Sequence, residues 1–167
     1  MASQTGRTVG SFVRFIVDDS GGTVREIPID SINGVGLDFG GADTTALQDA
    51  VKSVLPETPD CVIEITGPFD NTAAAAAGGS AAAPSLSGSH TVLSAIAGVQ
   101  TPLTLDVRFG IRHYWETGEP QFGITSTAAN GFVCTKYTVD PGAMKYSATL
   151  RVVAGSAAPA WGTAADK

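Results

Sequence analysis

The stretch Leu103-Thr104-Leu105-Asp106-Val107-Arg108-Phe109-Gly110-Ile111 decides the fold class of this chain. Large apolar side chains occupy its odd positions, and threonine, charged residues and glycine occupy the even ones. Because successive side chains of a strand point to opposite faces of a sheet, this alternation predicts one buried face and one face in water. The stretch is therefore expected to form a strand of an antiparallel sheet.

Other β-forming stretches lie along most of the chain, and turn residues separate them. The turn signals Asp-Asp-Ser-Gly-Gly at 18–22 and Asp-Pro-Gly at 140–142 each predict a hairpin. The predicted strands are residues 11–17, 23–29, 32–39, 61–66, 103–111, 121–126, 132–139 and 145–153. With no alternation of strands and long helices, they predict a mainly β fold: a β-sandwich or barrel of about seven to eight strands.

One convincing helix is expected beside these strands, at residues 45–55. Thr45 and Gln48 have the spacing of a capping box, and Pro56 would end the helix. The apolar residues recur at helical spacing: Ala46, Leu47, Ala50, Val51, Val54 and Leu55. So short a helix needs to pack this face on the sheet. A second short helix is predicted at residues 90–97.

The chain is expected to form a single domain over residues 1–167, with an insertion and a tail. Residues 71–105 contain no Asp, Glu, Lys or Arg, and residues 72–89 are nearly all Ala, Gly and Ser. Residues 154–167 read as an extended C-terminal tail. A loop of small uncharged residues is poor material for catalysis, but it can lie flat against a neighbouring copy.

The composition and the N-terminal sequence indicate in which compartment the chain is made. The 167 residues are 43% hydrophobic, yet no apolar run approaches the roughly 20 residues that span a bilayer. The N-terminus lacks an apolar leader, so synthesis in a cytoplasm is expected, with no membrane partner. In that reducing compartment, Cys61 and Cys134 are interpreted as buried small hydrophobes, and a disulfide between them is the minor alternative.

The net charge of −6 is unevenly placed. Residues 1–70 hold 4 basic and 11 acidic residues, for −7, and residues 71–167 hold 6 basic and 5 acidic residues, for +1. A nucleic-acid binder needs a clustered basic excess, which the sequence lacks, so no specific nucleic-acid binding is expected. The acidic half either repels DNA or keeps the protein soluble.

Signals for chemistry are weak. His90 and His113 are the only histidines, and His113 lies in Arg112-His113-Tyr114-Trp115-Glu116. A catalytic histidine needs a nucleophile beside it, and the sequence places none there. The two cysteines and two histidines have no zinc-like spacing, and no phosphate-binding or dinucleotide motif is present. The expectation is no enzyme, no cofactor and no metal.

Candidate contact residues are apolar or aromatic. Trp161 stands out in the small-residue tail, where it either folds back onto the core or anchors in a neighbouring copy. The aromatic cluster around His113 is expected to face a loop or a partner. The proposed subunit contacts are Leu37, Phe39, His113, Trp115 and Trp161.

Several segments resemble one family. Residues 15–27 (FIVDDSGGTVREI) resemble the opening of the tail tube proteins of long-tailed phages. Residues 43–47 (DTTAL), 62–72 (VIEITGPFDNT), 89–94 (SHTVLS) and 145–150 (KYSATL) are also similar to that family, in the same order along the chain. The stretch 56–60 (PETPD) and the Ala-rich insertion depart from its pattern.

The resemblance implies a β-sandwich flanked by a helix, assembling into stacked hexameric rings around a DNA conduit. Related folds also occur in capsid decoration proteins on the head exterior. The leading hypothesis is a tail tube subunit of a virion, and the alternative is a head decoration or cement protein. A soluble enzyme or ligand-binding module is the third reading. The implied partners are copies of the chain itself and other virion proteins, either tail proteins or the major capsid protein.

Overall fold

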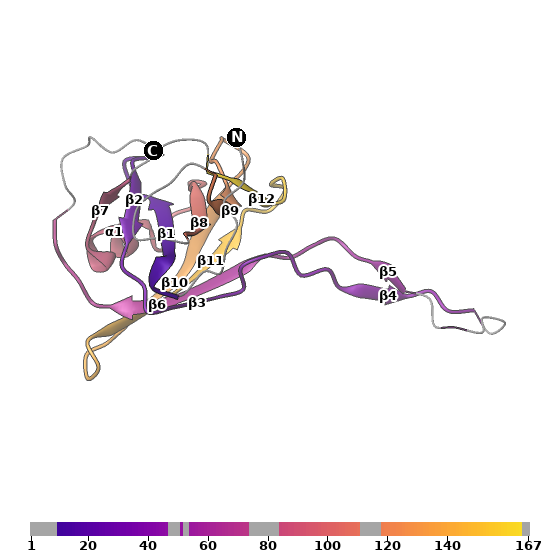
Figure 1. Cartoon of the computed structure of the whole chain (residues 1–167), viewed down its shortest axis with the longest axis horizontal. Coiled ribbons are helices and arrows are strands. Elements are labelled where there is room, and N and C mark those ends of the chain that lie inside the picture. The colour runs from indigo at the N-terminus through magenta and orange to yellow at the C-terminus, as the bar shows by residue number, and fades with distance from the viewer. Residues whose placement is uncertain (1–9, 47–50, 52–53, 74–83, 111–117, 165–167) are drawn as a thin grey trace.

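Two β-sheets packed face to face form the body of the protein, and a thin two-stranded arm projects from it (Figure 1). The structure, a computed structural model, describes residues 10–46, 51, 54–73, 84–110 and 118–164. Within these residues it contains a short 3-10 turn, twelve strands and one α-helix. The prediction of a mainly β fold with one short helix is confirmed, as a sandwich with no closed barrel among the described strands. The additional strands are short ones that the sequence pattern does not resolve.

The larger sheet has six strands in the order β12-β9-β8-β1-β2-β7. Every neighbouring pair is antiparallel except β2 and β7, which run parallel. The strands are β1 (Val13–Asp18), β2 (Val24–Ile27), β7 (Ser85–Leu86), β8 (Leu105–Phe109), β9 (Pro120–Ile124) and β12 (Ala160–Thr163). Two of its strands thus come from segments expected to lie in the insertion and in the tail.

The smaller sheet has four antiparallel strands in the order β10-β11-β6-β3. Its strands are β3 (Ser31–Asn33), β6 (Val62–Pro68), β10 (Phe132–Asp140) and β11 (Lys145–Val152). The hairpin predicted at residues 140–142 joins β10 to β11, and the Asp140 carboxylate accepts a 2.9 Å hydrogen bond from the Gly142 amide. The predicted closing hairpin is confirmed.

The hydrophobic core lies between the two sheets. Alternate side chains of each strand point inward, as the period-2 pattern predicts. The core includes Phe15, Val17, Leu105, Val107 and Phe122 from the larger sheet and Ile63, Ile65, Phe132, Cys134, Ala148 and Leu150 from the smaller one. Cys61 and Cys134 are both buried and free, which confirms their interpretation as small hydrophobes.

The helix α1 (Ser89–Ile96) packs against both sheets, in contact with β2, β10 and β11. Val92, Leu93 and Ile96 recur at helical spacing and are all buried in the core. The second, shorter helix predicted from the sequence is therefore present. Ser89 anchors its start, because the Ser89 hydroxyl donates a 2.7 Å hydrogen bond to the Pro68 carbonyl at the end of β6.

The prediction of a helix at residues 45–55 is wrong, as far as the structure describes these residues. Residues 47–50 and 52–53 lie outside them, but Val54 and Leu55 belong to a strand, β5 (Val54–Pro56), that pairs with β4 (Gly41–Asp43). A short apolar run suits a strand as well as a helix. An isolated helix of this length needs a sheet to pack on. The strand β5 instead lies in the arm, away from both large sheets (Figure 1). The strand predicted at residues 32–39 likewise ends early, as β3, because the chain leaves the sheet after Asn33.

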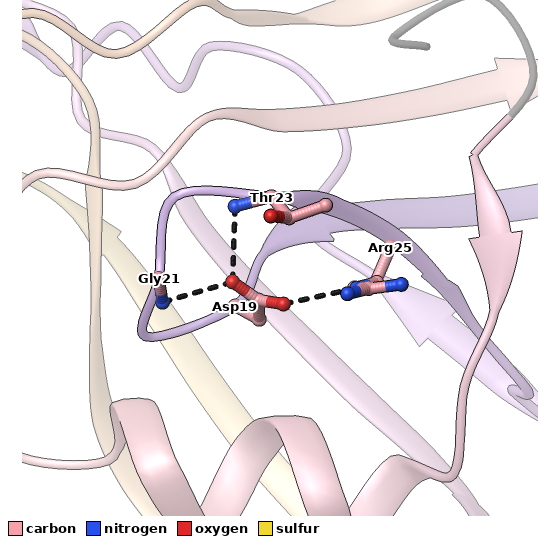
Figure 2. A network of polar contacts seen from close by, with 4 residues as sticks. All are labelled: Asp19, Gly21, Thr23 and Arg25. Carbon is pink, nitrogen blue, oxygen red and sulfur yellow. Dashed lines mark hydrogen bonds and ion pairs between the residues drawn. The ribbon is translucent and has the colours of Figure 1, made fainter. Parts of the chain in front are cut away.

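The turn between β1 and β2 is held by one carboxylate (Figure 2). Asp19 Oδ1 accepts hydrogen bonds of 2.9 Å from the amides of Gly21 and Thr23. Its Oδ2 accepts a 2.9 Å ion-paired hydrogen bond from Arg25 Nε. Partial burial raises the pKa of Asp19, but the hydrogen bonds from Thr23, Arg25 and Gly21 outweigh it and hold the pKa below its ordinary value.

The depressed pKa of Asp19 predicts a pH-dependent loss on substitution. We expect Asp19→Asn to lower the free energy of unfolding by on the order of 1 kcal/mol at pH 7. Because the folded-state pKa is lowered, the Asp19 contribution is present above the unfolded-state value near 4 and is lost as the pH falls through the folded-state pKa. Urea unfolding from pH 7 to pH 2.5, roughly, should show the two proteins converging. Glu64→Gln, at an exposed position of β6, is the control. A gap that persists unchanged at the acid end would contradict the assignment.

Candidate assembly surfaces

The first candidate surface is the arm, defined here as residues 37–60. At its base Asp38 and Asp60 exchange two backbone hydrogen bonds, with N···O distances of 2.9 and 2.8 Å. Further out, the Glu57 amide donates a 2.8 Å hydrogen bond to the Gly40 carbonyl, and β4 pairs with β5. The two sides of the arm are therefore hydrogen-bonded at its base and again along β4 and β5, and Figure 1 shows the arm extending away from the body.

The base of the arm is flanked by two hollows. One, of about 390 Å³, is lined by the 34–38 segment together with Asp60 and Val62. The other, of about 310 Å³, lies among residues 58–61, 152–153, 155–156 and 158–159. Leu37 lines both, and it is half-buried against the core. Of the predicted contact residues, Leu37 is thus placed at the junction of arm and body.

The arm exposes large apolar side chains. Phe39 is 54% exposed, Val54 51% and Leu55 60%. Half of the eight large apolar side chains that are exposed among the described residues lie on the arm, with Val51 as the fourth. Leu55 stands opposite Ala42, and Val54 stands opposite Asp43. Since neighbours on one strand point to opposite faces, the arm presents an apolar side chain on each of its two faces.

The sequence predicts Phe39 as a contact residue, but its pattern predicts a core-facing helix for Val54 and Leu55. Two signals mark them as part of an arm. Gly40-Gly41 before them and Pro56-Glu57-Thr58-Pro59-Asp60 after them are rich in residues that break regular elements. The second of these was already the stretch that departs from the family pattern.

The second candidate surface is the edge strand β12, which is exposed along its whole length. Trp161 lies opposite Phe122 on β9, and their ring centroids are 5.1 Å apart. A second ring, that of Phe109, lies 5.5 Å from Trp161. Trp161 therefore folds back onto the core rim, yet 58% of its surface stays exposed. A role for Trp161 as a subunit contact remains a prediction.

The remaining predicted contacts, His113 and Trp115, lie outside the described residues. His90 is half-buried on α1, where its Nδ1 lies 2.8 Å from the Tyr137 hydroxyl and its ring contacts that of Phe69 in a tilted arrangement, with centroids 4.8 Å apart. Within the described part of the chain, no group of three or more His, Cys, Asp and Glu side chains could hold a metal ion. No described helix is long and apolar enough to cross a membrane.

The outer face of β8 differs from the expectation that it would be in water. Thr104 and Arg108 are buried, and Asp106 is half-buried. Burial raises the pKa of Asp106, with Arg108 opposing the rise. Burial lowers the pKa of Arg108, and Asp106, Glu119 and Glu26 oppose that change. Asp106 on the same strand, Glu119 and Glu26 thus offset the charge of the buried Arg108, and the exposed candidates are the arm and β12.

Among the described residues, the exposed lysine and arginine side chains lie on two neighbouring strands, β10 and β11. Lys136 on β10 and Lys145 and Arg151 on β11 are exposed, whereas Arg25 and Arg108 are buried. Lys136 stands opposite Thr149, which is two residues from Arg151 on β11, so Lys136 and Arg151 share the outer face of the smaller sheet. Lys145 is paired with Asp30 at 2.9 Å.

The chain is similar to known proteins in structure but not in sequence. No protein-family model and no curated protein sequence matches the chain. The tube-terminating cap of the anti-feeding prophage has a TM-score of 0.57 at 11% identity, covering 98% of this chain and 96% of its own. A sheath/tube terminator of the PVC extracellular contractile injection system has a TM-score of 0.54 at 12% identity, covering 96% and 99%.

A third similar structure comes from the PVC sheath-tube complex, with a TM-score of 0.50 at 11% identity over 90% of this chain and 88% of that one. The match extends over nearly the whole length of both chains for the two terminators. This chain therefore shares its fold with components of contractile injection systems, two of which terminate a tube.

Proposed function

We propose that this protein is a structural subunit of a phage tail or tail-like injection particle, in which copies of it form a ring that belongs to the tube. The observation that carries the proposal is that the structural match covers nearly all of both chains in each comparison with a tube terminator. It covers 98% of this chain and 96% of the anti-feeding prophage cap. It covers 96% of this chain and 99% of the PVC terminator. The sandwich and its arm together thus match nearly the whole length of two tube-associated chains. The ordered resemblance to tail tube proteins, which rests on other observations, supports the same particle.

Within the tube, the first candidate position is the shaft, as a repeated ring around a DNA conduit. The family resemblance of the 15–27 and 62–72 segments supports it. Its partners would be copies of the chain and adjoining tail proteins. The excess of acidic residues in the first 70 positions is compatible with a lumen that does not hold DNA. No catalytic step is part of this function.

The second candidate position is the end of the tube. The two terminators match with higher TM-scores, 0.57 and 0.54, than the chain from the sheath-tube complex, at 0.50. A terminating ring contacts a tube on one side only, so it does not polymerise by itself. A decoration protein on the head remains the alternative outside the tail, but none of the three similar structures is a head component.

Electron microscopy of the purified protein, alone and mixed with tail tubes and with heads, separates these positions. We expect rings that either stack into hollow tubes or bind only the ends of preformed tubes. The first result would assign the shaft and the second would assign the terminator. Binding to heads alone, or a species that stays monomeric at high concentration and binds neither tubes nor heads, would overturn the proposal.

A further inference from the structure

The arm exposes apolar side chains that packing against another molecule would bury. A two-stranded hairpin is at best marginally stable in water without further packing. The arm nevertheless extends away from both large sheets and carries half of the exposed large apolar side chains that the structure describes (Figure 1). Because Val54 and Leu55 point to opposite faces, a surface that touches one face leaves the other in water. Such an element is suited to insertion among neighbouring molecules.

The charge of the arm indicates what chemistry the neighbour has. Residues 37–60 contain five acidic residues and one lysine, a net charge of −4. Asp38 and Asp60 form a directly opposed pair at the base, where like charges repel. Glu57 and Asp43 are exposed further out. A partner surface with exposed cations would relieve this repulsion.

The chain itself carries such a surface. The exposed lysine and arginine side chains that the structure describes all lie on β10 and β11, and Lys136 and Arg151 share one outward face there. That face also carries Thr138, Ser147 and Thr149 beside the cations, with Asp140 at the end of β10 and Glu64 on the adjoining strand β6 as its acidic members. It is an open sheet face that can accept a flat hairpin.

We propose that the arm of one copy lies across the outer face of β10 and β11 of a second copy, with its acidic side chains against Lys136 and Arg151. This contact rests on the proposed function, because a ring supplies the second copy at a fixed distance. One apolar face of the arm then packs on the receiving sheet, and the other is covered by the next molecule of the assembly. Complementary charge sets the register of the contact and speeds its formation.

A charge exchange tests the contact. Glu57→Lys alone and Lys136→Glu alone should each raise the protein concentration needed for assembly by about tenfold or more. The double variant should restore assembly to near the wild-type concentration. Both positions are exposed, and unchanged thermal unfolding of the unassembled variants would show that the fold is intact. Two single variants that assemble as the wild type does, or a double variant that assembles no better than either, would overturn the proposal.

Glu64→Lys is the matched control, because it makes the same charge change on the outer face of the receiving sheet. It should leave assembly unchanged or strengthen it, whereas a loss equal to that of Glu57→Lys would mean that net charge alone matters and would overturn the contact. As a second measurement, Glu57→Cys and Lys136→Cys copies carrying different tags should cross-link to each other on mild oxidation. Absence of that cross-link in assembled particles would also overturn it.

The wild type separates this contact from the proposed function. If the wild type neither forms rings nor binds tubes, the proposed function fails before any variant is compared. If the wild type assembles while the charge variants behave identically to it, the function stands and the arm contact is wrong.

Discussion

Replacing Phe122 with alanine is expected to lower the free energy of unfolding by about 3–5 kcal/mol. Phe122 is fully buried on β9, on the face that packs toward the smaller sheet. Its loss removes apolar contacts and leaves a cavity that a two-layer sandwich fills only partly by relaxing. It also removes the ring on which Trp161 rests, so β12 loses part of its attachment to the larger sheet.

Urea unfolding followed by circular dichroism measures this loss. Phe39→Ala is the matched control, since it makes the same chemical change on the exposed arm, and it should alter the stability of the unassembled protein by no more than about 0.5 kcal/mol. Similar losses for the two variants would contradict the placement of Phe39 in water. A loss below about 1 kcal/mol for Phe122→Ala would contradict the placement of Phe122 in the core.

Gly34→Ala is expected to destabilise the protein by at least about 2 kcal/mol. Gly34 has φ of +76°, where a side chain costs about 1–2 kcal/mol through contact with its own backbone. A Cβ there would also lie 1.9 Å from the Val62 carbonyl oxygen, so β6 and the 34–38 segment that leads into the arm must move apart. The substitution therefore acts where the arm leaves the body.

Gly22→Ala separates the two causes. Gly22 has a nearly identical φ of +74°, but a Cβ there meets no atom within 4 Å. Its expected loss is the backbone cost alone, about 1–2 kcal/mol. Thermal unfolding of both variants gives the difference that belongs to the collision with Val62. Equal losses would mean that the 34–38 segment moves aside freely.

Much of the sandwich could be predicted from local patterns. The alternation at residues 103–111 and the turn residues at 18–22 and 140–142 identify strands and hairpins because each depends only on neighbouring residues. The helix α1 follows from the spacing of Val92, Leu93 and Ile96. The pairing of β1 with β8 and the parallel contact of β2 with β7 involve residues far apart in the sequence, and no local pattern carries that information.

The candidate surfaces were predictable in part. Phe39 and Trp161 stand out as large side chains among small ones, and both are exposed. Val54 and Leu55 were placed in a helix because their spacing fits both periods, and only the position of the segment outside both sheets decides between them. The buried Arg108 is accompanied by the carboxylates of Asp106 on its own strand, Glu119 just before β9 and Glu26 on β2, whereas the alternation of its own strand predicts a face in water.

The order of the strands along the chain bears on how copies emerge from the ribosome. The arm pairs residues close in sequence, so it can form early in translation. β1 can pair with β8, and β6 with β11, only after the later strand of each pair has been synthesised. Until then neither sheet has its central pair. The cationic face of β10 and β11 is therefore among the last parts to be synthesised. On the proposed contact, a nascent chain has synthesised the arm residues before the strands that receive an arm, so only a completed molecule can take both sides of that contact.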